Sequence, residues 1–134
     1  YGRTTGRARR CGWFDAVVAR RGVMVNGATS VALTKIDVLC GVETIKICTA
    51  YNYRGQQIDQ LPTNPTALRE CEPVYEKMAG WTEPLDKCTS IDEFPPNARA
   101  YIARIEELIG CKISILSVGP ARSQTIVLND PFVV

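Results

Sequence analysis

The most regular hydrophobic pattern lies near the carboxyl end of the chain, where apolar residues recur three and four positions apart. The residues of this stripe are Ala98, Tyr101, Ile102, Ile105, Leu108 and Ile109. Their spacing predicts an amphipathic helix over residues 97–109, and Gly110 stands where such a helix would end. A second helix is predicted over residues 15–25, because Asp15 can cap its first turn and Asn26-Gly27 can end it.

Other segments carry the patterns of β-strands. β-branched and apolar residues with few charges run from residue 30 to residue 39, and this run predicts a largely buried strand. Apolar and polar residues alternate over residues 43–51, which predicts the next strand. Shorter strands are predicted at residues 56–61, 74–78, 112–116 and 124–128.

The remaining segments favour turns and loops. Residues 1–12 are rich in glycine and arginine, residues 52–55 suit a turn, and residues 62–71 and 79–96 are rich in proline. Strands interleaved with helices predict α/β or α+β architecture. A chain of 134 residues is long enough for one domain with a core of its own.

Composition narrows the classes of protein. Hydrophobic residues make up 46% and charged residues 22% of the chain, as in globular proteins, and no apolar run approaches the length of a membrane span. The net charge of +2 is unevenly spread. Residues 1–40 carry seven basic and two acidic side chains, which favours an anionic partner for this end. The chain has no histidine, which excludes histidine-based triads and histidine metal sites within it.

Six cysteines are spread along the chain without a close pair. Structural zinc sites normally place ligand pairs a few residues apart, so a metal site built from these thiols is not expected. The apolar content can supply a core without disulfides, so we expect reduced cysteines, Cys48 as a small core residue, and a cytoplasmic protein. The chain starts at Tyr1 without an initiator methionine, signal peptide or targeting tail, which suggests a fragment or a processed piece.

The run Leu33-Thr34-Lys35-Ile36-Asp37 places a lysine and an aspartate two residues apart among apolar residues. A carboxylate at the edge of a pocket can accept two parallel N–H bonds, and guanine offers such a pair where adenine does not. The Lys35 stem could lie along the base while its ammonium stays hydrated. By itself, however, Lys-x-Asp on a half-buried strand is more often a solvated face.

Two further segments could contact a ligand. Thr4-Thr5-Gly6-Arg7-Ala8-Arg9-Arg10 combines guanidinium groups with hydroxyls and backbone amides, a combination that suits carboxylates or phosphates. A solvated basic segment or a nonspecific nucleic-acid contact would have the same composition. Ser117-Val118-Gly119-Pro120 predicts a turn between two strands, where glycine allows close approach of a ligand; a purely structural turn is the alternative.

Taken in order, these segments resemble the adenylosuccinate synthetase family. The resemblance rests on TTGRARRCGWFD (4–15), LTKIDVL (33–39), PVYEKMAGW (73–81), YIARIEELIG (101–110), SVGPAR (117–122) and DPF (130–132). It covers essentially the whole chain. It implies that residues 1–134 are the C-terminal portion of a larger α/β protein with a mixed, mostly parallel central sheet of the P-loop NTPase type, with helices packed on the strands.

The resemblance also implies an activity and its substrates. The family joins inosine monophosphate (IMP) to L-aspartate at the expense of GTP and forms adenylosuccinate, a step in AMP synthesis. GTP phosphorylates the purine 6-oxygen, and the aspartate amine then displaces that phosphate. The whole enzyme would be a homodimeric ligase that forms a C–N bond, with Mg²⁺ bridging the phosphates. The resemblance implies no membrane and no nucleic-acid partner.

Site residues follow from the same resemblance, position by position. Residues 1–12 match the substrate loop, whose residues for aspartate and IMP are Thr4, Thr5, Gly6, Arg7 and Arg9. Thr5 and Arg9 would hold the aspartate carboxylates, while Arg7 would reach both aspartate and the ribose. Segments 30–39 and 112–122 match the GTP site, whose residues are Lys35, Asp37, Ser117, Gly119 and Pro120.

Two departures from the family pattern stand out. Arg3 occupies a position where relatives usually carry a small apolar residue. The family's glycine-rich phosphate loop, catalytic Asp, catalytic His and Mg²⁺ site have no counterpart in this sequence. We therefore expect no catalytic residue and no metal ligand in this chain, and no activity from it alone.

Two other functions fit parts of the sequence. A basic nucleic-acid-binding module would explain the charge of residues 1–40, and it predicts binding that weakens steeply with salt and ignores the base. A small GTPase-like regulator would also use Lys-x-Asp to bind guanine. It needs a phosphate loop, which the chain lacks, and it gives the arginine-rich loop no role.

Overall fold

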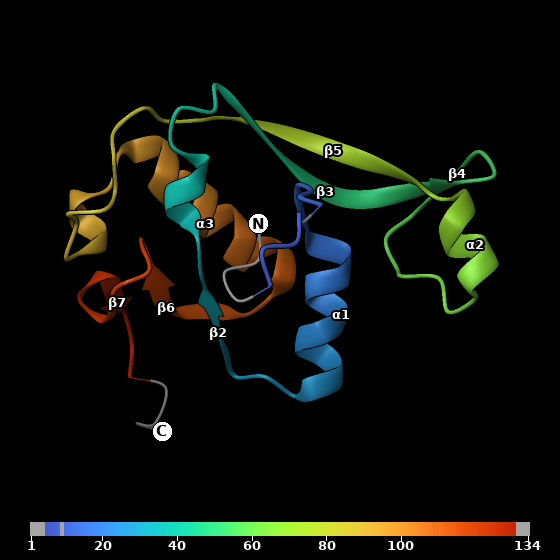
Figure 1. Ribbon diagram of the computed structural model, residues 1–134. Coiled ribbons are helices and arrows are strands. Elements are labelled where there is room, and N and C mark those ends of the chain that lie inside the picture. The colour runs from blue at the N-terminus through green and yellow to red at the C-terminus, as the bar shows by residue number, and fades with distance from the viewer. Residues whose placement is uncertain (1–4, 9, 131–134) are drawn as a thin grey trace.

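The computed structural model describes residues 5–8 and 10–130. Its longest helix, α3 (Pro96–Ile109), lies between two small β-sheets (Figure 1). It contacts β5 (Glu72–Ala79) of one sheet and β6 (Lys112–Ser117) of the other. Helix α3 therefore joins the two sheets into one body.

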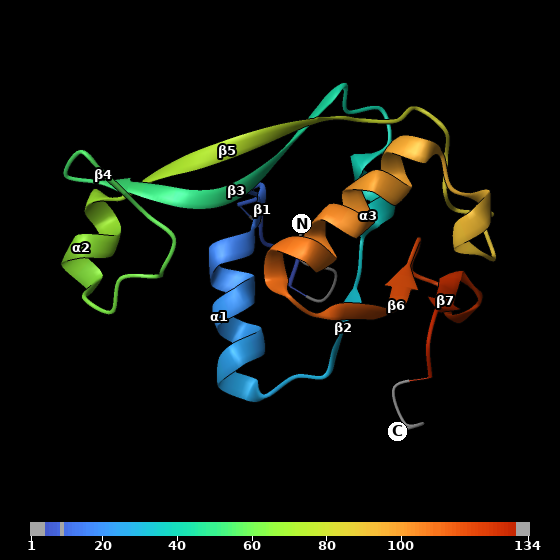
Figure 2. The same ribbon diagram turned by 180° about the vertical axis from the view of Figure 1, so that it is seen from behind.

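The first sheet is built around β3 (Thr44–Tyr53). β1 (Phe14–Asp15) runs parallel to β3, while β4 (Gln56–Ile58) and β5 run antiparallel to it. Helix α1 (Ala16–Asn26) packs against β3 and α3. The ribbon of β3 and β5 projects beyond α1 and carries α2 (Pro65–Glu70) near its far end (Figure 2).

The second sheet has β6 at its centre. β2 (Ser30–Leu33) pairs with β6 in parallel, and Leu33 lies opposite Leu116. β7 (Thr125–Val127) pairs with β6 in the antiparallel direction. Because β2 and β6 are parallel neighbours, their carboxyl ends meet at the same edge of this sheet.

Two of the five strand pairings within residues 5–8 and 10–130 are parallel, and three are antiparallel. The structure thus confirms an α/β fold with mixed sheets and with helices packed on the strands. That the central sheet of a larger protein is mostly parallel stays a prediction.

The apolar stripe of α3 forms the centre of the core, as its spacing predicts. Its buried residues are Ala98, Tyr101, Ile102, Ile105 and Ile109. The same cluster contains apolar side chains of both sheets, among them Ile45, Ile47, Ile113 and Leu116. Trp81 packs on Tyr101 with ring centroids 6.0 Å apart. Burial of this stripe is the main hydrophobic contribution to the fold.

Both long helices begin and end close to the predicted residues. The Asp15 carboxylate accepts a hydrogen bond from the Val18 N–H at 3.0 Å and so caps α1. Gly27 and Gly110 follow α1 and α3 in the left-handed conformation, with φ of 59° and 65°. Cys48 is buried, as predicted.

The other predicted strands are confirmed with shifted ends, since residues 43–51, 56–61, 74–78, 112–116 and 124–128 correspond to β3, β4, β5, β6 and β7. The predicted turn at 52–55 is confirmed at Arg54-Gly55. Short 3₁₀ helices at Ile91–Glu93 and Arg122–Gln124 lie in the loops that precede α3 and β7.

The strand predicted over residues 30–39 is wrong in its second half. β2 ends at Leu33, because Lys35 adopts a left-handed conformation with φ 63° and ψ 30°. The chain then continues as a 3₁₀ helix, Ile36–Leu39, that buries Ile36. β2 is also less buried than predicted, since Ala32 is exposed.

The loop predicted over residues 62–71 is wrong as well, because it contains helix α2. Asn64 caps this helix by accepting a hydrogen bond from the Thr66 N–H at 2.8 Å. Pro65 occupies the first turn, where a missing N–H costs nothing. Pro65, which favoured a loop in the sequence, is thus the first residue of helix α2.

Gly80 is the position where the fold tolerates an added side chain least. A Cβ there would lie 1.7 Å from the Val42 carbonyl oxygen. We expect Gly80→Ala to lower the free energy of unfolding of the 134-residue chain by about 2 kcal/mol or more, because the backbones must separate. Urea unfolding followed by circular dichroism measures this.

The matched control is Gly22→Ala in helix α1, where an added Cβ meets nothing within 4 Å. This change should raise the free energy of unfolding by about 0.5–1 kcal/mol, since alanine favours a helix interior. Equal effects of the two substitutions would contradict the close approach at Gly80.

Candidate functional site

Two of the predicted ligand segments meet at one edge of the second sheet. Lys35 and Asp37 follow the carboxyl end of β2, and the 117–120 turn (Ser117–Pro120) starts at the carboxyl end of β6. The 3₁₀ helix Ile36–Leu39 contacts β6 directly. In open α/β sheets, ligands bind in the crevice outside the carboxyl ends of parallel strands. The fold thus brings these five predicted residues to the place where such a ligand would lie.

The Lys35–Asp37 segment is held by its own short helix. The Val38 N–H donates to the Lys35 carbonyl at 3.3 Å, and the Cys40 N–H donates to the Asp37 carbonyl at 3.2 Å. Ile36, only 2% exposed, fixes the helix to the core. Lys35 is exposed and Asp37 is half-buried. This arrangement presents a carboxylate at the surface on a backbone that has little freedom to move.

The Asp37 carboxylate has acceptor capacity to spare. Within residues 5–8 and 10–130, no side chain or backbone group donates a hydrogen bond to it and no cation pairs with it. The chain's exposed ion pairs involve other carboxylates, such as Glu70 with Arg54 at 3.0 Å. Two unoccupied carboxylate oxygens match the pair of N–H donors on guanine.

The 117–120 turn is fixed by hydrogen bonds. The Ser117 hydroxyl donates to the Gly119 carbonyl at 2.9 Å. The Val118 N–H donates to the Gln124 carbonyl at 2.9 Å, and the Val118 side chain is fully buried. Glycine at 119 was expected to let a ligand approach closely. The structure instead shows the Gln124 amide against it, since a Cβ on Gly119 would lie 2.2 Å from Gln124 Oε1.

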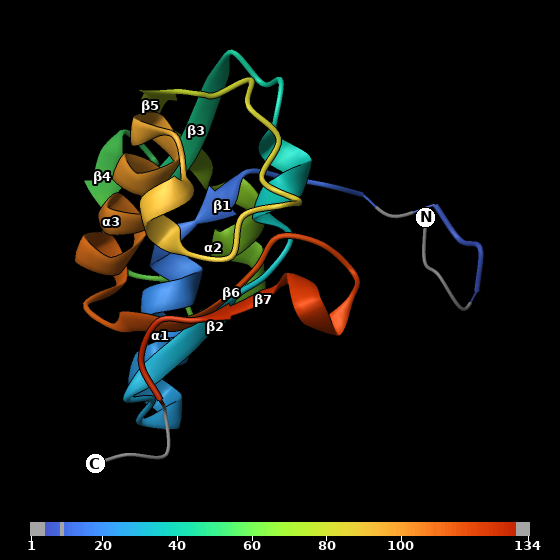
Figure 3. The ribbon, with the colours of Figure 1, turned by 90° about the vertical axis from the view of Figure 1, so that its left-hand side faces the viewer.

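The segment before β1 lies on the same side of the molecule as these two segments. Figure 3 shows its described part running outward from the side of the molecule that also carries the 3₁₀ helix after β2 and the loop between β6 and β7. Thr5, Gly6 and Arg7 are exposed, and Gly6 has a left-handed φ of 61°. Thr4 and Arg9 lie outside the described residues, as do Arg3 and the end of the DPF motif.

A small cavity of about 200 Å³ connects this segment with the segment that carries Lys35. Gly12, Trp13 and Phe14 line one side of it. The other side is lined by Leu33, Thr34, Lys35, Ile36, Val38 and Leu39, and Asp37 is not part of this lining. Tyr101 of α3 also lines it, and burial raises the pKa of Tyr101 to about 12. Its phenol is therefore neutral at physiological pH and contributes a packing surface.

Asp15 fixes the point where the N-terminal segment enters the body. One carboxylate oxygen accepts the Val18 N–H, and the other accepts the hydroxyl of Tyr51 on β3. Burial and this hydrogen bond raise the pKa of Tyr51 above its usual range. The position of residues 12–14 is thus set by β3 and α1 together.

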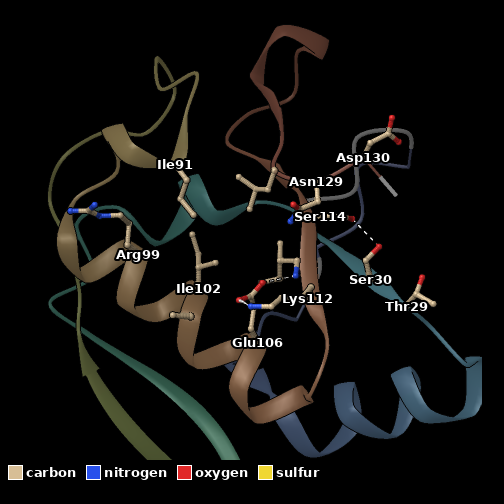
Figure 4. Close-up of a pocket in the computed structure, with 13 residues that line it drawn as sticks. Thr29, Ser30, Ile91, Arg99, Ile102, Glu106, Lys112, Ser114, Asn129 and Asp130 are labelled. Atoms are coloured by element: carbon tan, nitrogen blue, oxygen red, sulfur yellow. Dashed lines mark hydrogen bonds and ion pairs between the residues drawn. The ribbon is translucent and has the colours of Figure 1, made fainter. Parts of the chain in front are cut away.

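A larger cavity, of about 660 Å³, lies instead at the amino ends of β2 and β6. Several of its polar groups bond to one another (Figure 4): the hydroxyls of Ser30 and Ser114 are 3.0 Å apart, and Glu106 accepts from Lys112 Nζ at 3.1 Å and from the Ile113 N–H at 2.8 Å. These groups have less capacity for a ligand than Asp37. Size alone therefore does not make this cavity the better candidate.

Within residues 5–8 and 10–130, no group of three or more Cys, Asp or Glu side chains is arranged to hold a metal ion. In the same part of the chain, no helix is long and apolar enough to cross a membrane. The six cysteines are free thiols.

The fold and the site define an α/β chain whose candidate ligand residues lie together at the carboxyl ends of two adjacent parallel strands. The family model described as adenylosuccinate synthetase matches residues 1–126. The chain therefore belongs to the adenylosuccinate synthetase family, as the motif order predicts.

Known members of the family match the chain over nearly its whole length. The adenylosuccinate synthetase of Geotalea daltonii is 54% identical over 132 residues, 98% of this chain and 31% of that protein. The synthetase of Lysinibacillus sphaericus is 54% identical over 130 residues, 97% of this chain and 30% of that protein. The chain thus spans about 30% of the length of the curated relatives it matches.

A solved structure supports the same assignment. The fully ligated adenylosuccinate synthetase from Plasmodium falciparum superimposes with a TM-score of 0.90 at 38% sequence identity. The match covers 96% of this chain and 31% of that one. The arrangement of elements described above is therefore the arrangement in the corresponding part of that enzyme.

The left-handed conformation of Lys35 carries a cost that glycine would not have. We expect Lys35→Gly to leave the free energy of unfolding of the chain unchanged or to raise it by up to about 1 kcal/mol, because relief of strain offsets the greater freedom of glycine in the unfolded state. Urea unfolding of the 134-residue chain measures this.

Thr34→Gly is the matched control, since Thr34 does not have a positive φ. It should lower the free energy of unfolding by about 0.5–1 kcal/mol. If Lys35→Gly destabilises the chain as much as Thr34→Gly does, the backbone at Lys35 is not strained.

Proposed function

We propose that this chain supplies guanine and aspartate recognition to an adenylosuccinate synthetase, the GTP-dependent ligase that joins IMP and L-aspartate. One observation carries the proposal. Lys35, Asp37 and the 117–120 turn stand together at the carboxyl ends of two adjacent parallel strands, where a nucleotide base would lie. Membership of the family supports the assignment of GTP as the ligand.

Asp37 would distinguish guanine from adenine. Its carboxylate accepts the ring N–H and the exocyclic amine of guanine, two charge-assisted hydrogen bonds that adenine cannot form. Lys35 is exposed, so its stem can cover one face of the base with its ammonium in water. Ser117, Gly119 and Pro120 would close over the base from the other side.

The N-terminal segment would bind the second substrate. Thr5 and Arg9 hold the two carboxylates of L-aspartate, and Arg7 reaches both aspartate and the ribose of IMP. Arginine suits this task because its planar guanidinium binds a carboxylate with two parallel bonds. The basic character of residues 1–40 thus has a small-molecule role, and we do not propose nucleic-acid binding.

The chemical step would depend on residues beyond this chain. The sequence has no histidine and no phosphate loop, so the catalytic Asp, the catalytic His and the phosphate-binding loop belong to the other 70% or so of the enzyme's length. Mg²⁺, when bound, would offset the negative charge of the GTP phosphates. Within residues 5–8 and 10–130 no group of carboxylates is arranged to hold a metal ion, and the family resemblance assigns the Mg²⁺ site to that other part. Homodimer formation and a cytoplasmic location stay predictions.

The direct test of guanine recognition is Asp37→Asn in a full-length synthetase that carries this sequence. We expect KM for GTP to rise about tenfold or more, because losing a charged hydrogen-bond acceptor costs about 1.5–3 kcal/mol. KM for IMP should stay within about twofold. Steady-state assays with each substrate varied in turn measure both.

Asp59→Asn is the matched control, since Asp59 is an exposed carboxylate in the loop after β4. It should leave all three KM values unchanged. An unchanged KM for GTP in Asp37→Asn would remove Asp37 from the guanine site.

Arg9→Leu tests the aspartate loop in the same enzyme. Loss of a guanidinium that binds a carboxylate should raise KM for L-aspartate by about tenfold or more, with KM for GTP nearly constant. The adjacent Arg10→Leu removes the same charge from a position without an assigned contact. If the two variants behave alike, the effect is one of net charge and the assignment of Arg9 fails.

A further inference from the structure

We propose that Gln124 is a positioning residue for guanine recognition, which holds the 117–120 turn in the shape that binds the base. The sequence patterns do not single out Gln124, and it follows the predicted turn by several residues. The inference rests on the proposed function, because it assumes that the 117–120 turn contacts guanine. Its observations are independent of those that assign Asp37.

Gln124 bonds to the turn region through both its backbone and its side chain. Its carbonyl accepts the Val118 N–H at 2.9 Å, and its own N–H donates to the Ala121 carbonyl at 3.0 Å. Its side-chain Oε1 accepts the Ala121 N–H at 3.0 Å. The backbone on both sides of Gly119 and Pro120 is therefore tied to one residue.

The side-chain amide of Gln124 also packs against Gly119, in the space that a side chain at this position would occupy. A Cβ built on Gly119 would lie 2.2 Å from Oε1, 2.4 Å from Cδ and 2.6 Å from Nε2 of Gln124. The Gly119 carbonyl in turn accepts the Ser117 hydroxyl at 2.9 Å. The amide thus packs directly against Gly119, and Ser117 is joined to the same residue by its hydroxyl.

Gln124 connects the turn to the body of the protein as well. Its Nε2 donates to the Asp86 carbonyl at 3.1 Å. Asp86 follows Leu85, which is 1% exposed and belongs to the main core, and the Cys88 N–H donates to the Leu85 carbonyl at 3.0 Å. The 117–120 turn is therefore connected to the core through the Gln124 side chain, the Asp86 carbonyl and the adjacent buried Leu85.

The turn has little other support. Pro120, Ala121, Arg122 and Ser123 are exposed, and Gly119 is half-buried. The buried residues on either side, Val118 and Ile126, belong to the main core whether or not the amide is present. Removal of the amide should therefore leave the fold intact and let the 117–120 turn move, which is the behaviour of a positioning residue.

The test uses a full-length synthetase that carries this sequence. Gln124→Leu keeps a side chain of similar size but removes both polar atoms. We expect it to raise KM for GTP by about tenfold, because two hydrogen bonds that hold the turn are lost. We expect KM for IMP, KM for L-aspartate and kcat at saturating GTP to stay within about twofold.

Gln124→Glu is the conservative variant, since it retains an acceptor for the Ala121 N–H, while its second oxygen cannot donate to the Asp86 carbonyl and must turn away from it. We expect KM for GTP in this variant to return to within about threefold of the unmodified enzyme. Gln60→Leu, at an exposed glutamine after β4, is the control and should change nothing.

Three results would overturn the inference. They are an unchanged KM for GTP in Gln124→Leu, an equal rise of all three KM values, or a Gln124→Glu variant as impaired as Gln124→Leu. The Asp37→Asn variant, assayed in parallel, separates the two claims. If Asp37→Asn raises KM for GTP and Gln124→Leu does not, only the role of Gln124 fails; if neither does, the guanine site itself is misplaced.

Discussion

The parallel pairing of β2 with β6 is the constraint on which the candidate site depends. These strands are separated by most of the chain, yet Leu33 lies opposite Leu116 in one sheet. A parallel pair places both carboxyl ends at the same edge, so the residues after each strand must approach one another. Lys35 and Asp37 after β2 thereby lie at the same edge of the sheet as the 117–120 turn after β6. An antiparallel pair would have sent them to opposite ends.

Helix α3 makes this pairing stable. Its apolar stripe packs against β6 and β5, and its residues Ile105 and Ile109 share a cluster with Ile113 of the sheet. The same helix supplies Tyr101 to the cavity between the N-terminal segment and the Lys35 segment. Core packing and site geometry therefore both depend on helix α3.

The two long helices could be predicted from the sequence, because interactions between residues close together in the chain determine where they begin and end. The helical stripe before Gly110 and the Asp15 cap specify α3 and α1, since hydrophobic period and capping act within a few residues. The end of β2 at Leu33 could not be predicted in the same way. It depends on a left-handed Lys35, a conformation that the rest of the structure imposes on a residue with no such preference.

The candidate site also contains residues that the sequence predicts and one, Gln124, that only the structure shows. Lys35 and Asp37 could be proposed because their chemistry matches guanine, and the motif order named the family. Gln124 carries no such chemistry in its type or spacing. Its role comes from distances between the turn, the 3₁₀ helix Arg122–Gln124 and the Asp86 carbonyl, contacts that exist only once the chain has folded.

The most direct measurement of the central claim is a calorimetric titration of a full-length synthetase that carries this sequence, and of its Asp37→Asn variant, with GDP and with IDP. IDP lacks only the exocyclic amine of guanine. The account predicts that the unmodified enzyme binds GDP about tenfold more tightly than IDP, and that this preference shrinks to about twofold or less in the variant, because one hydrogen bond of the pair is absent. An equal preference for GDP in both proteins would show that Asp37 does not contact the amine, and it would contradict the account.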